Sequence, residues 1–118
     1  MHILCIEDSP VDSEIIKRMT EAAHHQGTFV RDLQSAREVL EELTPDLIFV
    51  DIVLNTLRVG DEFVRELRAN GFSQPIIAVT ALALPHEIKK CLDSGFTEVL
   101  TKPYEIRQLA GLFTRYRS

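Results

Sequence analysis

The chain has 118 residues, and its 13 lysines and arginines against 18 aspartates and glutamates give a formal net charge of −5. This length allows one domain with its own hydrophobic core, which we expect over residues 1–118. The composition, 45% hydrophobic and 26% charged, excludes a disordered or collagen-like chain. No apolar run approaches the roughly 18 residues of a membrane span. The acidic balance also argues against nucleic acid as a direct partner.

The compartment is indicated by the N-terminal residues and the two cysteines. The first residues lack the basic segment and the small-residue cleavage site of a secretory signal. Cys5 and Cys91 lie within apolar patterns, which is typical of buried, reduced thiols. We therefore expect a cytoplasmic protein.

Short apolar runs alternate with amphipathic segments five times along the chain. The apolar runs, which are the predicted strands, cover residues 3–6, 28–33, 47–50, 76–79 and 97–100. Apolar residues recur at helical spacing within residues 11–22, 36–43, 63–67, 85–95 and 106–116. Ser35 with Glu38 three residues later predicts the start of the second helix. Pro85 and Gly95 predict the two ends of the fourth.

This alternation predicts a doubly wound α/β fold, in which helices cover both faces of a five-stranded parallel sheet. The first, third and fourth runs are nearly continuous hydrophobics, as expected for strands that are covered on both faces. The second run contains Arg31 and Asp32, and the fifth contains Glu98, so these two runs are predicted edges. The predicted strand order is 2-1-3-4-5, one of the two common doubly wound arrangements.

Polar residues follow four of the predicted strands. Glu7 and Asp8 follow the first, Asp51 follows the third, Thr80 ends the fourth and Lys102 follows the fifth. The carboxyl ends of parallel strands share one edge, and neighbouring strands lie about 4.8 Å apart, so these carboxylates are expected to lie close together. Carboxylates at that range favour a bound cation, and Mg²⁺ prefers such oxygen ligands. The Lys102 ammonium and the Thr80 hydroxyl could bind an anion at the same edge. Together with the carboxylates and a metal ion, they predict phosphoryl transfer to an aspartate oxygen.

In these residues the chain resembles the receiver domain of two-component response regulators, over essentially its whole length. The resemblance rests on Glu7-Asp8, the stretch 45–51 that ends in Asp51, Val79-Thr80-Ala81, and the stretch 95–104 that contains Lys102-Pro103. It implies the flavodoxin-like (βα)5 fold and a role in two-component or phosphorelay signalling. The implied partners are a histidine kinase or a histidine phosphotransfer protein and a downstream protein target. The implied assembly is a monomer or a weak dimer.

The resemblance implies that Asp51 accepts a phosphoryl group from a phosphohistidine in a Mg²⁺-dependent reaction. Asp8 would ligate Mg²⁺ directly and Glu7 through water. Asp51 and the backbone carbonyl of Val53 would complete the protein ligands. A receiver of this kind promotes only its own phosphorylation and dephosphorylation, so we do not expect an enzyme.

The resemblance also implies the contacts of the phosphoryl oxygens. The Thr80 hydroxyl, the backbone N–H of Ala81 and the Lys102 ammonium would hold them. Pro103 matches a Lys-Pro step that is often a cis peptide in the family. Phosphorylation would draw Thr80 inward and change the face formed by the fourth helix, the fifth strand and the fifth helix.

The chain departs from the family pattern at two places, and a third residue bears on the lifetime of the phosphoryl group. Val99 stands where the family usually has an aromatic switch residue, so the output step differs. The loop 52–60 is one residue longer and carries Leu57 and Val59, which we expect to be exposed; it is either a harmless lengthening or a docking surface. Val53 offers no hydrogen bond to an attacking water, so we expect slow loss of the phosphoryl group.

Two other functions remain open for this sequence. One is a pseudo-receiver that docks partners without being phosphorylated, which Val99 and the longer loop suggest. The other is a Mg²⁺-dependent phosphohydrolase with an aspartate nucleophile, of the haloacid-dehalogenase type. Such enzymes have a second aspartate two residues after the nucleophile, where this chain has Val53.

Overall fold

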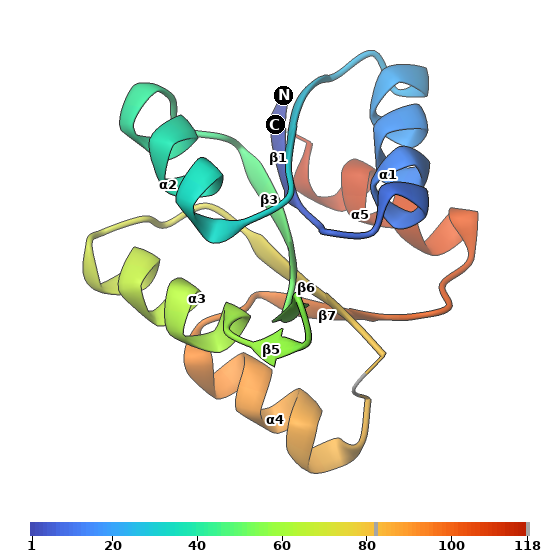
Figure 1. Cartoon of the computed structure of the whole chain (residues 1–118). Coiled ribbons are helices and arrows are strands. Elements are labelled where there is room, and N and C mark those ends of the chain that lie inside the picture. Colours follow the sequence, from blue (N-terminus) through green and yellow to red (C-terminus); the bar gives the residue numbers. More distant parts are fainter. Residues whose placement is uncertain (82, 118) are drawn as a thin grey trace.

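The computed structural model describes residues 1–81 and 83–117, and its centre is a five-stranded parallel sheet (Figure 1). The sheet has the order β2-β1-β3-β6-β7. Its strands are β1 (His2–Ile6), β2 (Gln26–Val30), β3 (Leu47–Asp51), β6 (Ile76–Thr80) and β7 (Glu98–Thr101). The predicted fold class and strand order are therefore confirmed, with β6 and β7 as the fourth and fifth strands. Strands β4 (Val53–Leu54) and β5 (Leu57–Arg58) form a separate small hairpin, which was not predicted.

Five helices connect the strands and cover the sheet on both faces, as the alternating pattern predicts. They are α1 (Pro10–Ala22), α2 (Leu33–Glu42), α3 (Gly60–Ala69), α4 (Pro85–Ser94) and α5 (Ile106–Tyr116). Helices α1 and α5 lie on one face, and α2, α3 and α4 lie on the other (Figure 1). Each face has its own hydrophobic cluster.

The two clusters follow from the alternation of side chains along the buried strands. In β1, Leu4 and Ile6 enter the cluster under α2–α4, whereas Ile3 and Cys5 enter the cluster under α1 and α5. Strands β1, β3 and β6 are almost wholly buried, which confirms them as interior strands. Both cysteines are free and buried, as predicted.

Local capping chemistry sets where the helices begin and end. The Ser9 hydroxyl accepts the Asp12 N–H at the start of α1. The predicted start of α2 at Ser35 is wrong, because Asp32 is the N-cap and accepts the Ser35 N–H at 2.7 Å. The same cap ends the preceding strand earlier than predicted. Gly95 ends α4 as predicted, with a φ of +118° that favours glycine.

The predicted inner faces of α1 and α5 are only partly right. In α1 the fully buried residues are Ile16 and Thr20, while Val11 is 71% exposed. In α5, Leu109, Leu112 and Phe113 are buried, but Ile106 is 62% exposed. Both exposed residues lie in the first turn of their helix, at the edge of the sheet that carries the polar residues.

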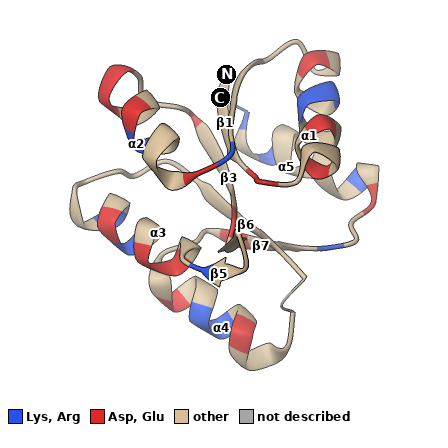
Figure 2. Ribbon diagram, viewed as in Figure 1, with Lys and Arg blue, Asp and Glu red and all other residues tan. Residues whose placement is uncertain are grey.

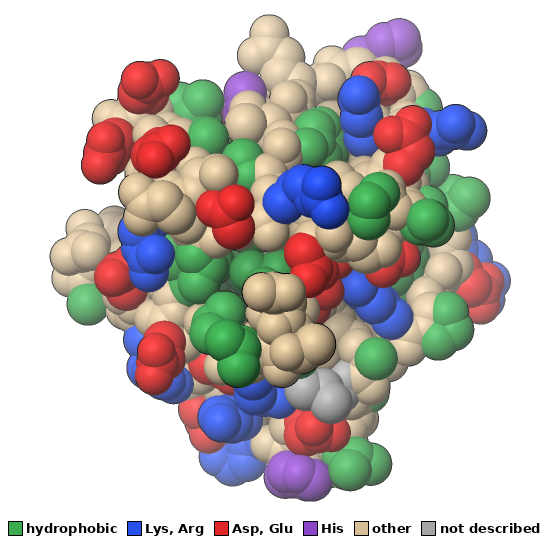
Figure 3. All heavy atoms as spheres, viewed as in Figure 1, with side chains coloured by type: hydrophobic (Ala, Val, Ile, Leu, Met, Phe, Trp, Pro, Cys, Tyr) green, Lys and Arg blue, Asp and Glu red, His purple; other side chains and the backbone are tan. Residues whose placement is uncertain are grey.

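Acidic and basic side chains are interspersed on the face drawn in Figure 3, so the net negative charge forms no single broad patch there. Among the described residues, no helix is both long enough and apolar enough to cross a membrane.

Candidate functional site

The polar residues predicted from the sequence lie at one edge of the sheet. Glu7 and Asp8 follow β1, Asp51 ends β3, Thr80 ends β6 and Lys102 follows β7. The strand register brings these ends level, because β1 pairs with β3 and β6 pairs with both β3 and β7. Figure 2 shows the acidic segments at the ends of β1 and β3, where the helices and loops leave the sheet.

The Lys102 ammonium lies among three carboxylates. Its Nζ is 3.0 Å from Glu7 Oε2, 3.0 Å from Asp12 Oδ2 and 3.2 Å from Asp51 Oδ2. An ammonium has three N–H donors, so each carboxylate receives one of them. Contacts of this kind between charged groups are stronger than neutral hydrogen bonds.

Asp12 was not among the predicted site residues. It lies in the first turn of α1, where Ser9 caps the helix and Pro10 is its first residue. The sequence signal for Asp12 was its position, four residues after Asp8 and two residues after the Ser9-Pro10 pair that starts the helix. Acidic residues are also common in that turn as partners of the helix dipole, so the position alone did not separate the two roles.

Glu7, Asp8 and Asp51 form a cluster of oxygen ligands. One carboxylate oxygen of each lies within 4.8 Å of those of the other two. Each carboxylate also accepts one backbone N–H, which orients it: Ser9 N–H to Glu7 at 3.1 Å, Val53 N–H to Asp51 at 3.0 Å and Asn55 N–H to Asp8 at 2.7 Å. Carboxylates at this separation, held by the backbone, match the oxygen ligands that Mg²⁺ prefers.

The charges of the site do not balance. Burial raises the pKa of Glu7 to about 7, against the hydrogen bonds that it accepts from Lys102 and the Ser9 N–H, and the neighbouring Asp51 adds to the rise. Burial tends to lower the pKa of Lys102, but the hydrogen bonds to Glu7 and Asp12 outweigh it and raise that pKa. The pKa of Glu7 is raised mainly by its burial, whereas the pKa of Lys102 is raised by its carboxylate partners. The single Lys102 ammonium cannot neutralise the four carboxylates of Glu7, Asp8, Asp12 and Asp51. The excess negative charge favours a bound cation.

The other two predicted phosphoryl-binding positions lie beside Lys102. Thr80 is 1% exposed, and its backbone carbonyl accepts the Lys102 N–H at 2.8 Å. Ala81 follows it, and together with Lys102 lines a cavity of about 380 Å³ between α1 and the segment after β7. The Lys102–Pro103 peptide bond is cis.

The loop after Asp51 forms the hairpin β4–β5 rather than an irregular loop. Asn55 and Thr56 are its turn residues and have φ values of +53° and +66°, the left-handed conformation that a two-residue hairpin turn requires. Leu57 is 62% exposed, as predicted. The prediction that Val59 is exposed is wrong, because Val59 packs partly buried against the core under α2–α4.

The hairpin is joined to the helices beyond it. Arg58 in β5 forms an ion pair of 2.6 Å with Asp61 in α3, and its guanidinium lies 4.0 Å from Glu87 in α4. Gly60 allows this close return, because a Cβ there would lie 2.6 Å from the Cα of Ile52. The hairpin therefore connects the acidic cluster to α3 and α4.

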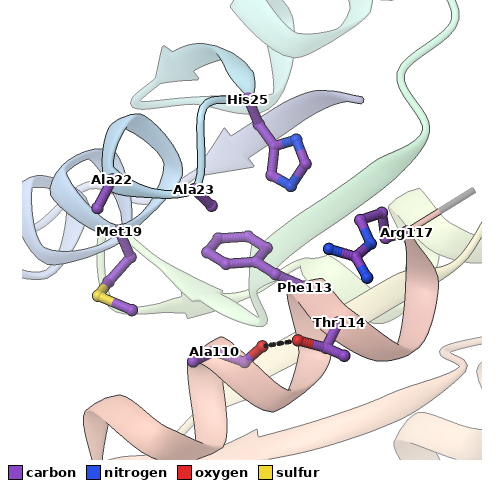
Figure 4. Close-up of a pocket in the computed structure, with 8 residues that line it drawn as sticks. All are labelled: Met19, Ala22, Ala23, His25, Ala110, Phe113, Thr114 and Arg117. Carbon is purple, nitrogen blue, oxygen red and sulfur yellow. Dashed lines mark hydrogen bonds between the residues drawn. The ribbon is translucent and has the colours of Figure 1, made fainter.

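A separate cavity of about 280 Å³ lies between the C-terminal end of α1 and α5. Figure 4 shows Phe113 pointing into it from α5, with His25 and Met19 around the ring and Arg117 beyond. None of the described residues that line it is acidic, and none belongs to the predicted site. It therefore offers neither the oxygen ligands nor the nucleophile of the sheet edge.

Comparison with known proteins identifies the family. Residues 3–113 match the model of the response regulator receiver domain. The receiver domain of sensor histidine kinase PA1611 from Pseudomonas aeruginosa, solved with a magnesium ion coordinated in its active site cleft, is 35% identical and superposes with a TM-score of 0.84 over 98% of this chain and 95% of that one. A receiver domain of a histidine kinase from Syntrophus aciditrophicus is 30% identical, with a TM-score of 0.85 over 98% of this chain and 88% of that one.

Curated relatives give the same result. The osmosensing histidine protein kinase SLN1 of Saccharomyces cerevisiae is 32% identical over 97% of this chain, and the sensor protein GacS of Pseudomonas syringae is 29% identical over the same share. The chain spans only 10% of SLN1 and 13% of GacS. This chain belongs to the response regulator receiver domain family, and it is similar to the receiver domains of histidine kinases.

Proposed function

We propose that Asp51 accepts a phosphoryl group from a phosphohistidine of a histidine kinase or a histidine phosphotransfer protein. The observation that carries this proposal is the 3.2 Å contact between Asp51 Oδ2 and Lys102 Nζ, beside the oxygen cluster of Glu7 and Asp8. A carboxylate nucleophile with an ammonium beside it can receive a phosphoryl group and stabilise its charge. The similarity to histidine kinase receiver domains supports the class of donor.

The residues present fit a magnesium ion. The three clustered carboxylates supply hard oxygen ligands, and their excess negative charge calls for a cation. Glu7, Asp8, Asp51 and the backbone carbonyl of Val53 would hold the ion. When bound, Mg²⁺ would neutralise negative charge that develops on the transferred group.

The residues of the chain perform the transfer in one displacement. An oxygen of Asp51 attacks the phosphorus while the phosphorus–nitrogen bond breaks, and the bonding electron pair leaves with the imidazole, which takes a proton from solvent. Lys102 remains protonated, as its raised pKa favours, and pairs with a phosphoryl oxygen. The Thr80 hydroxyl and the Ala81 N–H donate to the other oxygens.

The output proposed for the phosphorylated domain uses α4, β7 and α5. Inward movement of Thr80 changes the connection from β6 to α4. Two leucines of this region, Leu84 and Leu92, are 59% and 47% exposed and offer apolar contacts to a protein target. Val99 in β7 is partly buried against the core, and it cannot swing a ring in and out as an aromatic residue would, so rearrangement of the β6–α4 connection carries the signal.

Labelling of the purified domain tests the phosphoacceptor function. In Mg²⁺ with acetyl phosphate or phosphoramidate, intact-mass measurement is expected to show an adduct of about 80 Da on the wild type. Asp51→Asn is expected to show none. Asp93→Asn is the matched control, since Asp93 lies on α4 in an exposed pair with Lys89, and it should label as the wild type does. No adduct on the wild type, under conditions that label another receiver domain, would overturn the proposal.

A further inference from the structure

Asp12 is a fourth acidic side chain at the site, outside the cluster of Glu7, Asp8 and Asp51. Its carboxylate takes one of the three N–H donors of Lys102, at 3.0 Å. The Asp12 side chain is 32% exposed, against 2% for Glu7 and 10% for Asp51. A backbone N–H also holds Glu7, and another holds Asp51. Asp12 is therefore the partner that Lys102 releases most easily.

Tyr104 lies beside this contact with a buried hydroxyl that has no hydrogen-bond partner among the described residues. It lines the cavity of about 380 Å³ that Asp12 and Lys102 also line. Burial raises the pKa of Tyr104 to about 12, and the charge of Asp12 adds to the rise. A buried donor without an acceptor is unfavourable and uncommon in a native structure. The Tyr104 hydroxyl is thus an unused hydrogen-bond donor in the cavity that Asp12 also lines.

The number of donors on Lys102 limits its contacts. All three N–H groups are directed to carboxylates, so pairing with a phosphoryl oxygen requires that one carboxylate be released. A carboxylate released from Lys102 stays beside the other acidic groups, so a new hydrogen-bond donor stabilises it. The Tyr104 hydroxyl is such a donor, because it is buried and unpaired among the described residues and lines the same cavity as Asp12.

We propose that Asp12 and Tyr104 form an exchange pair for Lys102. In the unphosphorylated domain the Asp12 carboxylate accepts from Lys102. When Lys102 turns to a phosphoryl oxygen on Asp51, Asp12 instead accepts from the Tyr104 hydroxyl. Asp12 and Tyr104 are positioning residues that act through Lys102. This inference rests on the proposed phosphoacceptor function and adds to it what happens to the lysine between the two states.

A double-mutant cycle measured in two states tests the exchange. The variants are Asp12→Ala, Tyr104→Phe and the double variant. The first measurement is the free energy of unfolding in EDTA without any phosphoryl mimic, and the second is affinity for beryllofluoride in Mg²⁺. In EDTA the two substitutions are expected to act additively, because Asp12 and Tyr104 are not yet paired. For beryllofluoride, Tyr104→Phe is expected to weaken binding about fivefold in the wild-type background, the effect of one hydrogen bond, and to change nothing in the Asp12→Ala background.

Two control variants separate this effect from general damage. Tyr116→Phe removes a hydroxyl that donates to Glu98 from the last residue of α5, and should leave beryllofluoride affinity unchanged. Glu14→Ala removes a carboxylate from the same helix as Asp12, in an exposed pair with Arg18, and should show no coupling to Tyr104→Phe.

The outcomes distinguish failure of the exchange from failure of the phosphoacceptor function. Equal effects of Tyr104→Phe in both backgrounds would overturn the exchange while leaving the phosphoacceptor function intact. Coupling of the same size in EDTA would also overturn it, because the pair would then exist before phosphorylation. A wild type that neither binds beryllofluoride nor labels would overturn both.

Discussion

The backbone N–H of Asn55 donates a 2.7 Å hydrogen bond to Asp8 Oδ2, so the turn of the β4–β5 hairpin lies directly against a proposed metal ligand. Through Arg58 the same hairpin pairs with Asp61 and approaches Glu87. The longer loop therefore supports the site through its backbone, while its Leu57 side chain stays exposed. The hairpin backbone fixes one carboxylate of the acidic cluster, and its next strand is joined to α3 and α4.

The hairpin turn stores strain at Thr56. This residue has a φ of +66°, and a β-branched side chain is unfavourable in that conformation. Thr56→Gly is expected to raise the free energy of unfolding by about 1 kcal/mol, because glycine adopts the left-handed region without strain. Urea unfolding measures the change. Thr44→Gly is the control, since Thr44 is an exposed loop threonine without a positive φ, and it should destabilise instead. A stability loss at Thr56 equal to that at Thr44 would contradict the strain.

Lys102 holds the carboxylates together when no metal is bound. Lys102→Ala in EDTA is expected to lower the free energy of unfolding by about 3 kcal/mol, because it leaves buried and half-buried carboxylates without their shared partner. Saturating Mg²⁺ is expected to recover part of that loss, since a cation at the cluster replaces the missing charge. Urea unfolding with and without Mg²⁺ measures both the loss of stability and its recovery.

The control for that substitution is Lys89→Ala. Lys89 forms an exposed ion pair with Asp93 on α4, and exposed pairs contribute little to stability. Its loss should be small and independent of Mg²⁺. A Lys102 variant that behaves like the Lys89 variant in EDTA would show that the ammonium does not hold the cluster.

The residues at the sheet edge were predictable from the sequence, because the end of each apolar run shows which polar residue follows the strand. Continuous apolar runs identified the interior strands, and the parallel register then brought Asp8, Asp51 and Lys102 to one edge. Asp12 was missed for the opposite reason. Whether Asp12, in the first turn of α1, reaches Lys102 after β7 depends on the angle between α1 and the sheet. The local pattern of apolar residues does not specify that angle.

The errors in helix starts and exposed faces also have local physical causes. Ser35 and Asp32 both cap helices well, and the structure uses Asp32 because its side chain reaches the Ser35 N–H. Val11 and Ile106 continue the apolar spacing of their helices, yet both are exposed in the first turn of their helix. Periodicity identifies the stripe of a helix that can be buried, but the extent of the sheet decides which turns of that stripe are covered.

The side chain at Val53 bears on the lifetime of the phosphoryl group. Val53 donates only its backbone N–H, to Asp51, and its side chain cannot orient an attacking water. Loss of the adduct is expected to take many minutes, and Val53→Asn is expected to shorten its lifetime severalfold by supplying a polar group beside the phosphorylated carboxylate. Intact-mass measurements after removal of the donor follow the decay. A wild-type half-life of seconds, or a Val53→Asn lifetime equal to that of the wild type, would contradict this reading.

The pair between β7 and α5 makes part of the stability depend on pH. Glu98 accepts from Arg115 at 2.6 Å and from the Tyr116 hydroxyl. Burial tends to raise the pKa of Glu98, but the hydrogen bonds from Arg115 and Tyr116 outweigh it and lower that pKa. Because the folded-state pKa lies below the unfolded one, the stabilisation is fully present above the unfolded value of about 4.3 and is lost as pH falls through the folded value.

Glu98→Gln is therefore expected to destabilise the domain at neutral pH, and its difference from the wild type is expected to shrink as pH falls below about 4. Urea unfolding of both proteins across this range measures the difference directly. Glu14→Gln is the control, because Glu14 forms an exposed pair with Arg18 within one helix and should give a small difference at every pH. A difference between Glu98→Gln and the wild type that stays constant on acidification would show that the Glu98 carboxylate does not stabilise the contact of α5 with β7.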